Sequence, residues 1–335
     1  MKRFAAALAA TLCACAALAA DGPYAIAIHG GSGTITRASL APEREAAFRE
    51  ALSEALVAGQ RVLAGGGSSL DAVVAAVRVM EDSPLFNAGR GAVFTNEGTN
   101  EMDASVMDGR ERRAGAVAGV TTVRNPVLAA RAVMEKSRHV LLAGRGADLF
   151  AKEQGLEIVD PAYFRTEERW KQLERARERD KVPMDHDAPG KRGSAAAHGK
   201  LGTVGAVALD QAGNLAAATS TGGLTNKRFG RVGDSPLVGA GTWAENGVVA
   251  VSATGTGEMF IRGATAHDVA ALVKYKGLGP QAAADEALAK VRAIGGRGGV
   301  VVLDARGEAI FSFNTEGMYR GHAKGSARPE VLIFR

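Results

Sequence analysis

The hydrophobic and polar positions of this chain follow two periods, one typical of helices and the other typical of strands. Apolar residues recur at helical spacing in five segments: 42–64, 68–81, 125–136, 264–276 and 280–293. Short apolar or alternating runs predict strands at 24–29, 115–123, 203–209, 214–221, 247–253, 299–303, 309–314 and 331–334. Two of these strands flank the turn sequence Asp210–Gly213, which is typical of a hairpin. Strands joined in this way, with helices grouped in runs, favour an antiparallel sheet core covered by helices over a doubly wound parallel sheet.

One long polar segment interrupts this pattern between residues 164 and 202. Its first half is densely charged and is compatible with a helix. Its second half is rich in Pro, Gly, Ser and His, and it has too few apolar residues to order itself. We therefore expect a disordered charged linker over about 164–202.

The linker ends at Gly202 and Thr203, immediately before an apolar strand. A Gly-Thr pair is also an ordinary strand start, but the long polar segment before it favours a processed junction. Cleavage of the Gly202–Thr203 bond would leave Thr203 with a hydroxyl and a free α-amine, a nucleophile that carries its own base. Because an α-amine titrates at about 7.7–8.0, a useful fraction is unprotonated at neutral pH.

Length and composition indicate a globular protein with a substantial core. The chain has 335 residues, of which 46% are hydrophobic, enough for one large domain or two ordinary ones. The formal net charge of +5 is modest, and no stripe of Lys and Arg interleaved with aromatic residues is present. We therefore expect no nucleic-acid partner.

The first twenty residues have the basic start, apolar middle and small-residue end of a secretory signal peptide. Such a signal would direct the protein to the periplasm or to secretion, with cleavage near Ala19 or Ala20. Both cysteines, Cys13 and Cys15, lie inside this segment, so the mature chain would have no disulfide. A lipoprotein signal with Cys15 as the acylated residue is the alternative.

Glycine-rich segments with hydroxyl residues mark the candidate site. The turn at 29–34 lacks the Gly-Lys-Ser/Thr and the distant acidic residue of nucleotide-binding loops, so it more simply lets backbone approach closely. Downstream of Thr203, three such segments end or follow strands: 219–223, 230–241 and 253–258. Single Thr-Gly pairs are usually turns, but three of them near a candidate N-terminal threonine indicate a site.

These segments, together with Ile28–Gly33, Pro84–Phe94 and Met102–Gly109, resemble the isoaspartyl peptidase/L-asparaginase family of the N-terminal nucleophile hydrolases. The resemblance covers nearly all of 24–335. It implies an α+β fold, a four-layer αββα sandwich with antiparallel sheets between helix layers. It also implies self-cleavage into an α-subunit, 21–202, and a β-subunit, 203–335, assembled as a dimer of αβ heterodimers.

The resemblance also implies residue roles. Thr203 is the nucleophile, Thr221 hydrogen-bonds and activates it, and Thr254 with the backbone N–H of Gly255 forms the oxyanion hole. A second group holds the two charged ends of an aspartyl substrate: the Arg231 guanidinium grips the α-carboxylate, and Asp234 with the Gly257 carbonyl holds the α-ammonium.

A structural sodium ion is implied as well, bound by backbone carbonyls in the loop 80–90. The matching carbonyls are those of Met80, Glu81, Ser83, Phe86, Ala88 and Arg90. Neutral oxygen ligands suit a hard monovalent cation, and the mature chain lacks the soft ligands of a catalytic transition metal. No cofactor is expected for catalysis.

The function implied is cleavage of β-aspartyl amide bonds in isoaspartyl dipeptides and L-asparagine, with release of L-aspartate. Relatives that cleave glycosylated asparagine typically carry Asp before the nucleophile and Asn in place of Thr256. Gly202 and Thr256 therefore favour the isoaspartyl branch, with a glycosylasparaginase-like amidase as an alternative. An exported protein that binds amino acids without cleaving them is the alternative from another class.

Overall fold

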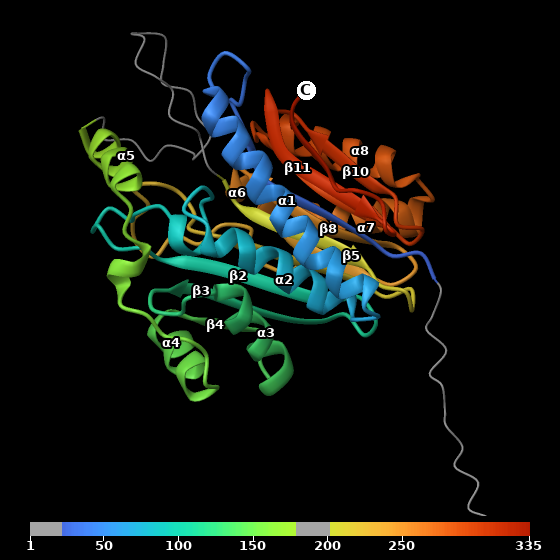
Figure 1. Ribbon diagram of the computed structural model, residues 1–335, viewed down its shortest axis with the longest axis horizontal. Helices are drawn as coiled ribbons and strands as arrows, with labels where there is room; N and C mark the ends of the chain where they lie inside the picture. Colours follow the sequence, from blue (N-terminus) through green and yellow to red (C-terminus); the bar gives the residue numbers. More distant parts are fainter. Residues whose placement is uncertain (1–21, 179–201) are drawn as a thin grey trace, which may run out of the picture.

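The computed structural model describes residues 22–178 and 202–335, which form a mixed α+β structure (Figure 1). The expected signal peptide and the second half of the expected linker lie outside the described residues. No helix in the described ranges has the length and apolar character needed to cross a bilayer.

An eight-stranded sheet forms the larger half of the structure, with the strand order β12-β11-β1-β5-β6-β2-β3-β4. Its strands are β1 (Ala25–Gly33), β2 (Met102–Asp108), β3 (Arg113–Val120), β4 (Leu141–Ala143), β5 (Val204–Leu209), β6 (Leu215–Thr221), β11 (Gly317–Lys324) and β12 (Glu330–Phe334). All neighbours are antiparallel except β3 and β4. Because β5 and β6 lie between β1 and β2, chain from both sides of Thr203 builds the centre of this sheet.

A second, four-stranded antiparallel sheet has the order β10-β9-β8-β7. It consists of β7 (Thr242–Glu245), β8 (Val249–Gly255), β9 (Gly298–Asp304) and β10 (Ala309–Phe313). The sheets pack face to face, with β1 against β9 and β5 against β8. Alternate residues of β5 separate the two cores: Val207 and Leu209 pack between the sheets, whereas Ala206 and Ala208 face the helices.

Helices cover the outer faces of both sheets (Figure 1). The helices are α1 (Pro42–Ala64), α2 (Ser69–Asp82), α3 (Pro126–Lys136), α4 (Gly144–Glu153), α5 (Glu167–Glu178), α6 (Gly257–Gly263), α7 (Thr265–Lys276) and α8 (Pro280–Ala293), with short 3-10 turns η1 (Gly89–Gly91) and η2 (Pro161–Phe164). Helices α1 and α2 lie on the large sheet, and α7 and α8 lie on the small one.

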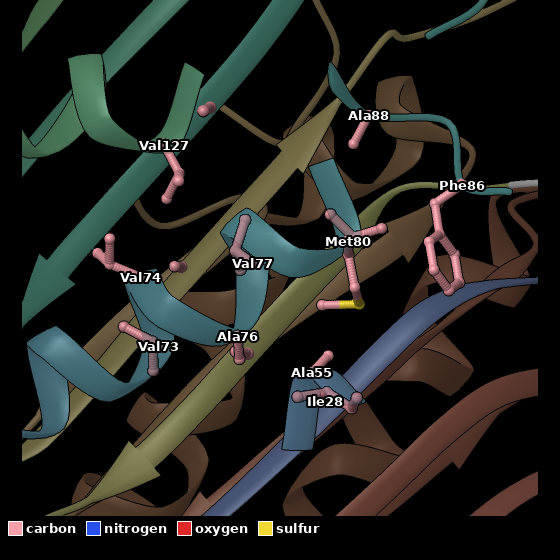
Figure 2. Close-up of a cluster of buried hydrophobic side chains, with 14 of the residues drawn as sticks. Ile28, Ala55, Val73, Val74, Ala76, Val77, Met80, Phe86, Ala88 and Val127 are labelled. Carbon is pink, nitrogen blue, oxygen red and sulfur yellow. The ribbon is translucent and has the colours of Figure 1, made fainter. Parts of the chain in front are cut away.

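The core beneath α2 shows why this helix forms where the sequence predicts it. The Ser68 hydroxyl accepts a hydrogen bond from the backbone N–H of Asp71 and so caps the N-terminus of the helix. Val73, Val77 and Met80 of this helix are buried and lie over the strands of the large sheet beside Ile28 (Figure 2). Burial of apolar side chains at helical spacing therefore fixes α2 on the sheet.

The sequence and the structure differ in several places, since α4, α6, β4 and β7 lie outside the predicted helices and strands. Disorder was expected over 164–202, but Glu167–Glu178 form α5, so that expectation is wrong for this part and the charged-helix alternative holds. The buried Arg169 anchors α5 by donating from Nε to the carbonyl of Gly91 over 2.8 Å. Strand β11 was missed because its polar residues, such as Arg320 and His322, hide the alternation expected of a strand.

Candidate active site

Two threonine hydroxyls meet at the ends of neighbouring strands. Thr203 is half-buried and directly precedes β5, and Thr221 is the last residue of β6. The antiparallel pairing places Val204 opposite Ser220, so the two threonines meet at the same edge of the sheet. Oγ1 of Thr203 donates to Oγ1 of Thr221 over 3.0 Å, and the backbone N–H of Gly223 donates to the same oxygen over 3.0 Å.

The glycine-rich turn at 29–34 contributes a side chain that the sequence reasoning missed. His29 is fully buried in β1, and its Nδ1 lies 3.0 Å from the carbonyl oxygen of Thr203. Its other ring nitrogen, Nε2, lies 2.8 Å from Oγ of Ser252 in β8. In the sequence, only its position in the His-Gly-Gly motif indicated a functional role, and that motif was interpreted as a turn that lets backbone approach closely.

Thr254 and Gly255 end β8 on the same side as Thr203. Residues two apart on a strand face the same way, so Thr254 points toward β1 and β5 as Ser252 does. Oγ1 of Thr254 is buried and has no hydrogen-bond partner among the described residues. Gly255 has a φ of 150°, and a Cβ there would meet the Arg297 carbonyl at 2.3 Å. The end of β8 therefore carries the Thr254 hydroxyl, which has no partner in the ranges that the structure describes, next to a backbone position that only glycine can occupy.

Arg231, Asp234 and Gly257 converge although they come from different segments. A Cβ built on Gly257 would lie 2.8 Å from Nη2 of Arg231 and 2.9 Å from Oδ1 of Asp234. Asp234 is buried, and its Oδ2 has no hydrogen-bond partner in the described part of the chain. Burial raises the pKa of Asp234 to about 7, and the nearby positive charge of Arg231 counters part of that shift.

Glu258 is a further charged group at this place, and the sequence reasoning gave it no role. Nε of Arg231 donates to one oxygen of Glu258 over 2.9 Å, and Nη2 donates to the other over 3.1 Å. Partial burial disfavours the ionised Glu258, but the hydrogen bonds and charge of Arg231 outweigh it, so the pKa of Glu258 lies below its ordinary value. One edge of the guanidinium is therefore already engaged by a carboxylate.

Asp103 and Lys227 add two buried ionisable groups that were also missed. Asp103 lies opposite Thr221 in the pairing of β2 with β6, and its Oδ1 accepts from the backbone N–H of Gly119 over 2.8 Å. Nζ of Lys227 donates to the carbonyl of Glu101 over 2.8 Å. Burial raises the pKa of Asp103 and lowers that of Lys227, and each group's charge partly offsets the other's shift. The motif Met102–Gly109 was the sequence signal for Asp103.

The six residues expected to supply carbonyls to a sodium ion lie in the loop from the end of α2 to η1. This loop folds tightly: a Cβ at Gly89 would meet the Glu81 carbonyl oxygen at 2.3 Å, and one at Gly91 would meet the Phe86 oxygen at 2.0 Å. Two of the expected carbonyls also accept within the loop, Met80 from Ser83 and Ala88 from Gly91. Within the described residues, no group of three or more His, Cys, Asp or Glu is arranged to hold a metal.

The Glu81 side chain points away from the expected sodium-binding loop and into the core beneath Thr203 and Thr221. Its Oε1 accepts from the backbone N–H of Val127 over 3.0 Å and from Oγ of Ser220 over 2.6 Å. Burial raises the pKa of Glu81 to about 8, although the hydrogen bond from Ser220 acts in the opposite direction. A buried carboxyl group thus contacts the residue next to Thr221.

Comparisons with known proteins match almost the whole chain. A family model described as asparaginase matches residues 22–333. The chain is 53% identical over 312 residues to an isoaspartyl peptidase of Salmonella typhimurium, covering 92% of this chain and 98% of the relative. It is 52% identical over 316 residues to an isoaspartyl peptidase of Escherichia coli, covering 94% and 97%. It is 43% identical over 327 residues to a probable isoaspartyl peptidase/L-asparaginase 2 of Arabidopsis thaliana, covering 93% and 99%.

Proposed function

This chain belongs to the asparaginase family, and from that premise we propose that it is an N-terminal nucleophile hydrolase of β-aspartyl amide bonds. Its substrates are isoaspartyl dipeptides and L-asparagine, and its common product is L-aspartate. The observation that carries this proposal is the 3.0 Å contact between the Thr203 and Thr221 hydroxyls beside the convergence of Arg231, Asp234 and Gly257. A nucleophile and two oppositely charged groups for the substrate ends lie in one region.

The enzyme activates itself by breaking the Gly202–Thr203 bond. The cut yields an α-subunit, 21–202, and a β-subunit, 203–335, both of which contribute strands to the large sheet. The two parts therefore remain one folded unit after cleavage. The new α-amine of Thr203 then accepts the proton of its own hydroxyl, and Thr221 orients that hydroxyl.

Hydrolysis then proceeds through a covalent ester. Oγ1 of Thr203 attacks the β-carbonyl carbon, and the Thr254 hydroxyl with the Gly255 N–H stabilises the developing oxyanion, at about 3 kcal/mol per donor. The carbon–nitrogen bond breaks as the leaving nitrogen takes the proton that the Thr203 α-amine accepted, which releases ammonia from asparagine or an amine from a dipeptide. Water then attacks the ester, and L-aspartate leaves with Thr203 restored.

The substrate is oriented by its two charged ends. Arg231 binds the α-carboxylate, and Asp234 with the Gly257 carbonyl binds the α-ammonium. The unpartnered Oδ2 of Asp234 supports this role, because a buried carboxylate oxygen without a donor is costly until a cation approaches it. The ammonium group of the bound substrate also favours the ionised form of Asp234.

The relatives favour this activity over the two alternatives. Those at 53% and 52% identity are named isoaspartyl peptidases, which supports neither a glycosylasparaginase-like amidase nor a non-catalytic binding protein. Gly202 and Thr256, at the two positions where glycosylasparaginases typically differ, agree with this choice.

Four further features complete the proposal. The helices on the outer faces of two packed sheets support a four-layer αββα sandwich. A structural sodium ion held by the backbone carbonyls of the loop at 80–90 is part of the proposal, because neutral oxygen ligands suit a hard monovalent cation. We further propose assembly as a dimer of αβ heterodimers, and export directed by residues 1–20.

Two measurements on the purified protein test the proposed function. A denaturing gel should resolve two fragments, and the smaller one should begin at Thr203. The same preparation should release ammonia from L-asparagine and leucine from β-aspartyl-leucine. A single intact chain that binds aspartate but cleaves neither substrate would establish the binding-protein alternative instead.

A further inference from the structure

A chain of buried polar side chains crosses the interface between the two sheets and ends at the nucleophile residue. It begins at the carbonyl of Ser235, next to Asp234, and ends at the carbonyl of Thr203. Its members, in order, are Ser105, Thr242, Thr219, Ser252 and His29. The successive contacts measure 2.6, 2.7, 2.6, 2.6, 2.8 and 3.0 Å. All five side chains are fully buried, so their polar groups depend on one another for hydrogen bonds.

The acceptor at the Thr203 end sets the direction of these hydrogen bonds. A carbonyl oxygen only accepts, so the hydrogen in its contact with the imidazole lies on Nδ1 of His29. In a neutral imidazole Nε2 is then an acceptor, and Oγ of Ser252 donates to it. Because the Ser252 hydrogen is engaged there, Thr219 donates to Ser252 over 2.6 Å rather than to the Gly241 carbonyl, which lies 3.2 Å away. Thr242 donates to Thr219, and Ser105 donates to Thr242, which leaves Ser105 no second hydrogen for the Ser235 carbonyl. The Thr203 carbonyl on one side of the ring and the Ser252 hydroxyl on the other therefore hold His29 in the tautomer that donates to Thr203.

The backbone leaves room for this arrangement at one glycine. A Cβ at Gly205 would lie 2.0 Å from Oγ of Ser252 and 2.4 Å from Nε2 of His29. The pairing of β1 with β5 ends at His29 opposite Gly205, so Thr203 extends beyond the last pair of these strands. The imidazole therefore reaches a carbonyl that lies past the end of that pairing.

We propose that His29 is a positioning residue for the nucleophile. Its Nδ1–H holds the Thr203 carbonyl, and the four hydroxyls hold the ring. This inference rests on the proposed function, in which Thr203 becomes the first residue of its subunit and is tied to the fold through one peptide group. Fixing that group fixes the Cα that carries both the attacking hydroxyl and the α-amine. A shift of about 1 Å in such atoms slows a reaction roughly hundredfold.

Two substitutions separate the two hydrogen bonds of the imidazole. In His29→Asn the side-chain amide nitrogen takes the place of Nδ1 and keeps the bond to the Thr203 carbonyl. In His29→Gln the longer amide takes the place of Nε2 and keeps only the contact with Ser252. We expect His29→Gln to lower kcat on β-aspartyl-leucine at least about tenfold, with KM within about twofold of the wild type. His29→Asn should lose several times less kcat than His29→Gln.

The rates are normalised to the fraction of chain that a denaturing gel shows as cleaved. A single uncleaved chain for His29→Gln, alongside a cleaved His29→Asn, also supports the inference, since both reactions use the Thr203 hydroxyl. The matched control is His322→Asn in β11, whose ring lies near Phe311 and outside the hydroxyl chain, and it should keep the wild-type kcat.

Equal losses of kcat in the two His29 variants, or a larger loss in His29→Asn, would overturn the inference. If neither variant yields soluble protein, Ser252→Ala takes their place, with the buried Ser312→Ala of β10 as its control. Ser252→Ala removes the hydrogen bond that holds the imidazole ring at Nε2 and should lower kcat severalfold relative to that control; an unchanged kcat overturns the inference. A wild-type protein that cleaves neither substrate refutes the proposed function itself, which keeps the two failures distinct.

Discussion

Arg231 and Glu258 form a two-point ion pair in which Nε and Nη2 each donate to a different carboxylate oxygen, over 2.9 and 3.1 Å. The pair occupies one edge of the guanidinium. The remaining nitrogen, Nη1, lies on the side of Gly223, which follows Thr221 at the end of β6: a Cβ on Gly223 would lie 3.5 Å from it. The free edge of Arg231 therefore faces the segment that carries the proposed catalytic threonines.

Arg231→Lys should separate processing from substrate binding. A lysine keeps the positive charge but loses the planar fork, so it cannot hold Glu258 and a substrate carboxylate through two paired bonds at once. The variant should still yield two fragments on a denaturing gel. Its kcat/KM on L-asparagine should fall by a factor that corresponds to a loss of about 2 kcal/mol or more of transition-state stabilisation. An unchanged kcat/KM on both substrates would refute the substrate pose.

Thr203→Ala should remain one chain and be inactive. The substitution removes the hydroxyl that attacks the Gly202 carbonyl during processing and the substrate carbonyl during hydrolysis. Mass spectrometry of the purified variant checks this expectation. Recovery of the variant split between residues 202 and 203 would instead assign the cut to a separate protease.

Glu81→Gln should change how stability depends on pH. The pKa of Glu81 is about 8 in the folded protein and near the ordinary 4.5 when unfolded, so between these values the folded state holds one more proton. Stability therefore falls as pH rises across this window, by up to about 1.4 kcal/mol per pH unit from this group.

The Gln variant lacks that proton, so its free energy of unfolding should vary less with pH between 5 and 8. Urea titrations of both proteins at pH 5, 6.5 and 8 measure the difference. Parallel pH profiles for the two proteins would contradict a buried neutral carboxyl group at this position.

Divalent-metal chelators should leave the hydrolysis rate unchanged. The proposed reaction uses an amine base and an oxyanion hole, neither of which needs a Lewis acid. Ammonia release measured before and after prolonged incubation with EDTA checks this. Loss of activity that zinc restores would reject the assignment of loop 80–90 to a sodium ion.

The mature α-subunit should begin near Asp21. The basic start and apolar middle of residues 1–20 predict a signal peptide that is removed during export. N-terminal sequencing of protein recovered from the periplasm or the medium tests this. A lipid-modified Cys15 in the membrane fraction would replace this signal type with the lipoprotein alternative.

Local sequence patterns determined much of the secondary structure. The helix predicted at 42–64 has the bounds of α1, and the turn Asp210–Gly213 joins β5 to β6 as expected. Such elements follow from apolar spacing and turn residues, which act within a few positions of one another. Strand β11 was not predicted, because its polar sequence gives no local strand pattern. It forms because it pairs with β1 in the sheet.

By itself, the sequence also determined the candidate nucleophile and the residues around it, because Thr203 and the glycine-rich segments stand out by type and order. Only the tertiary structure decided which groups surround them. His29 lies 174 positions before Thr203 and Glu81 lies 139 before Ser220, yet each pair is in hydrogen-bond contact. Those contacts arise from strand insertion, helix packing and burial, which bring together residues that no short-range pattern connects.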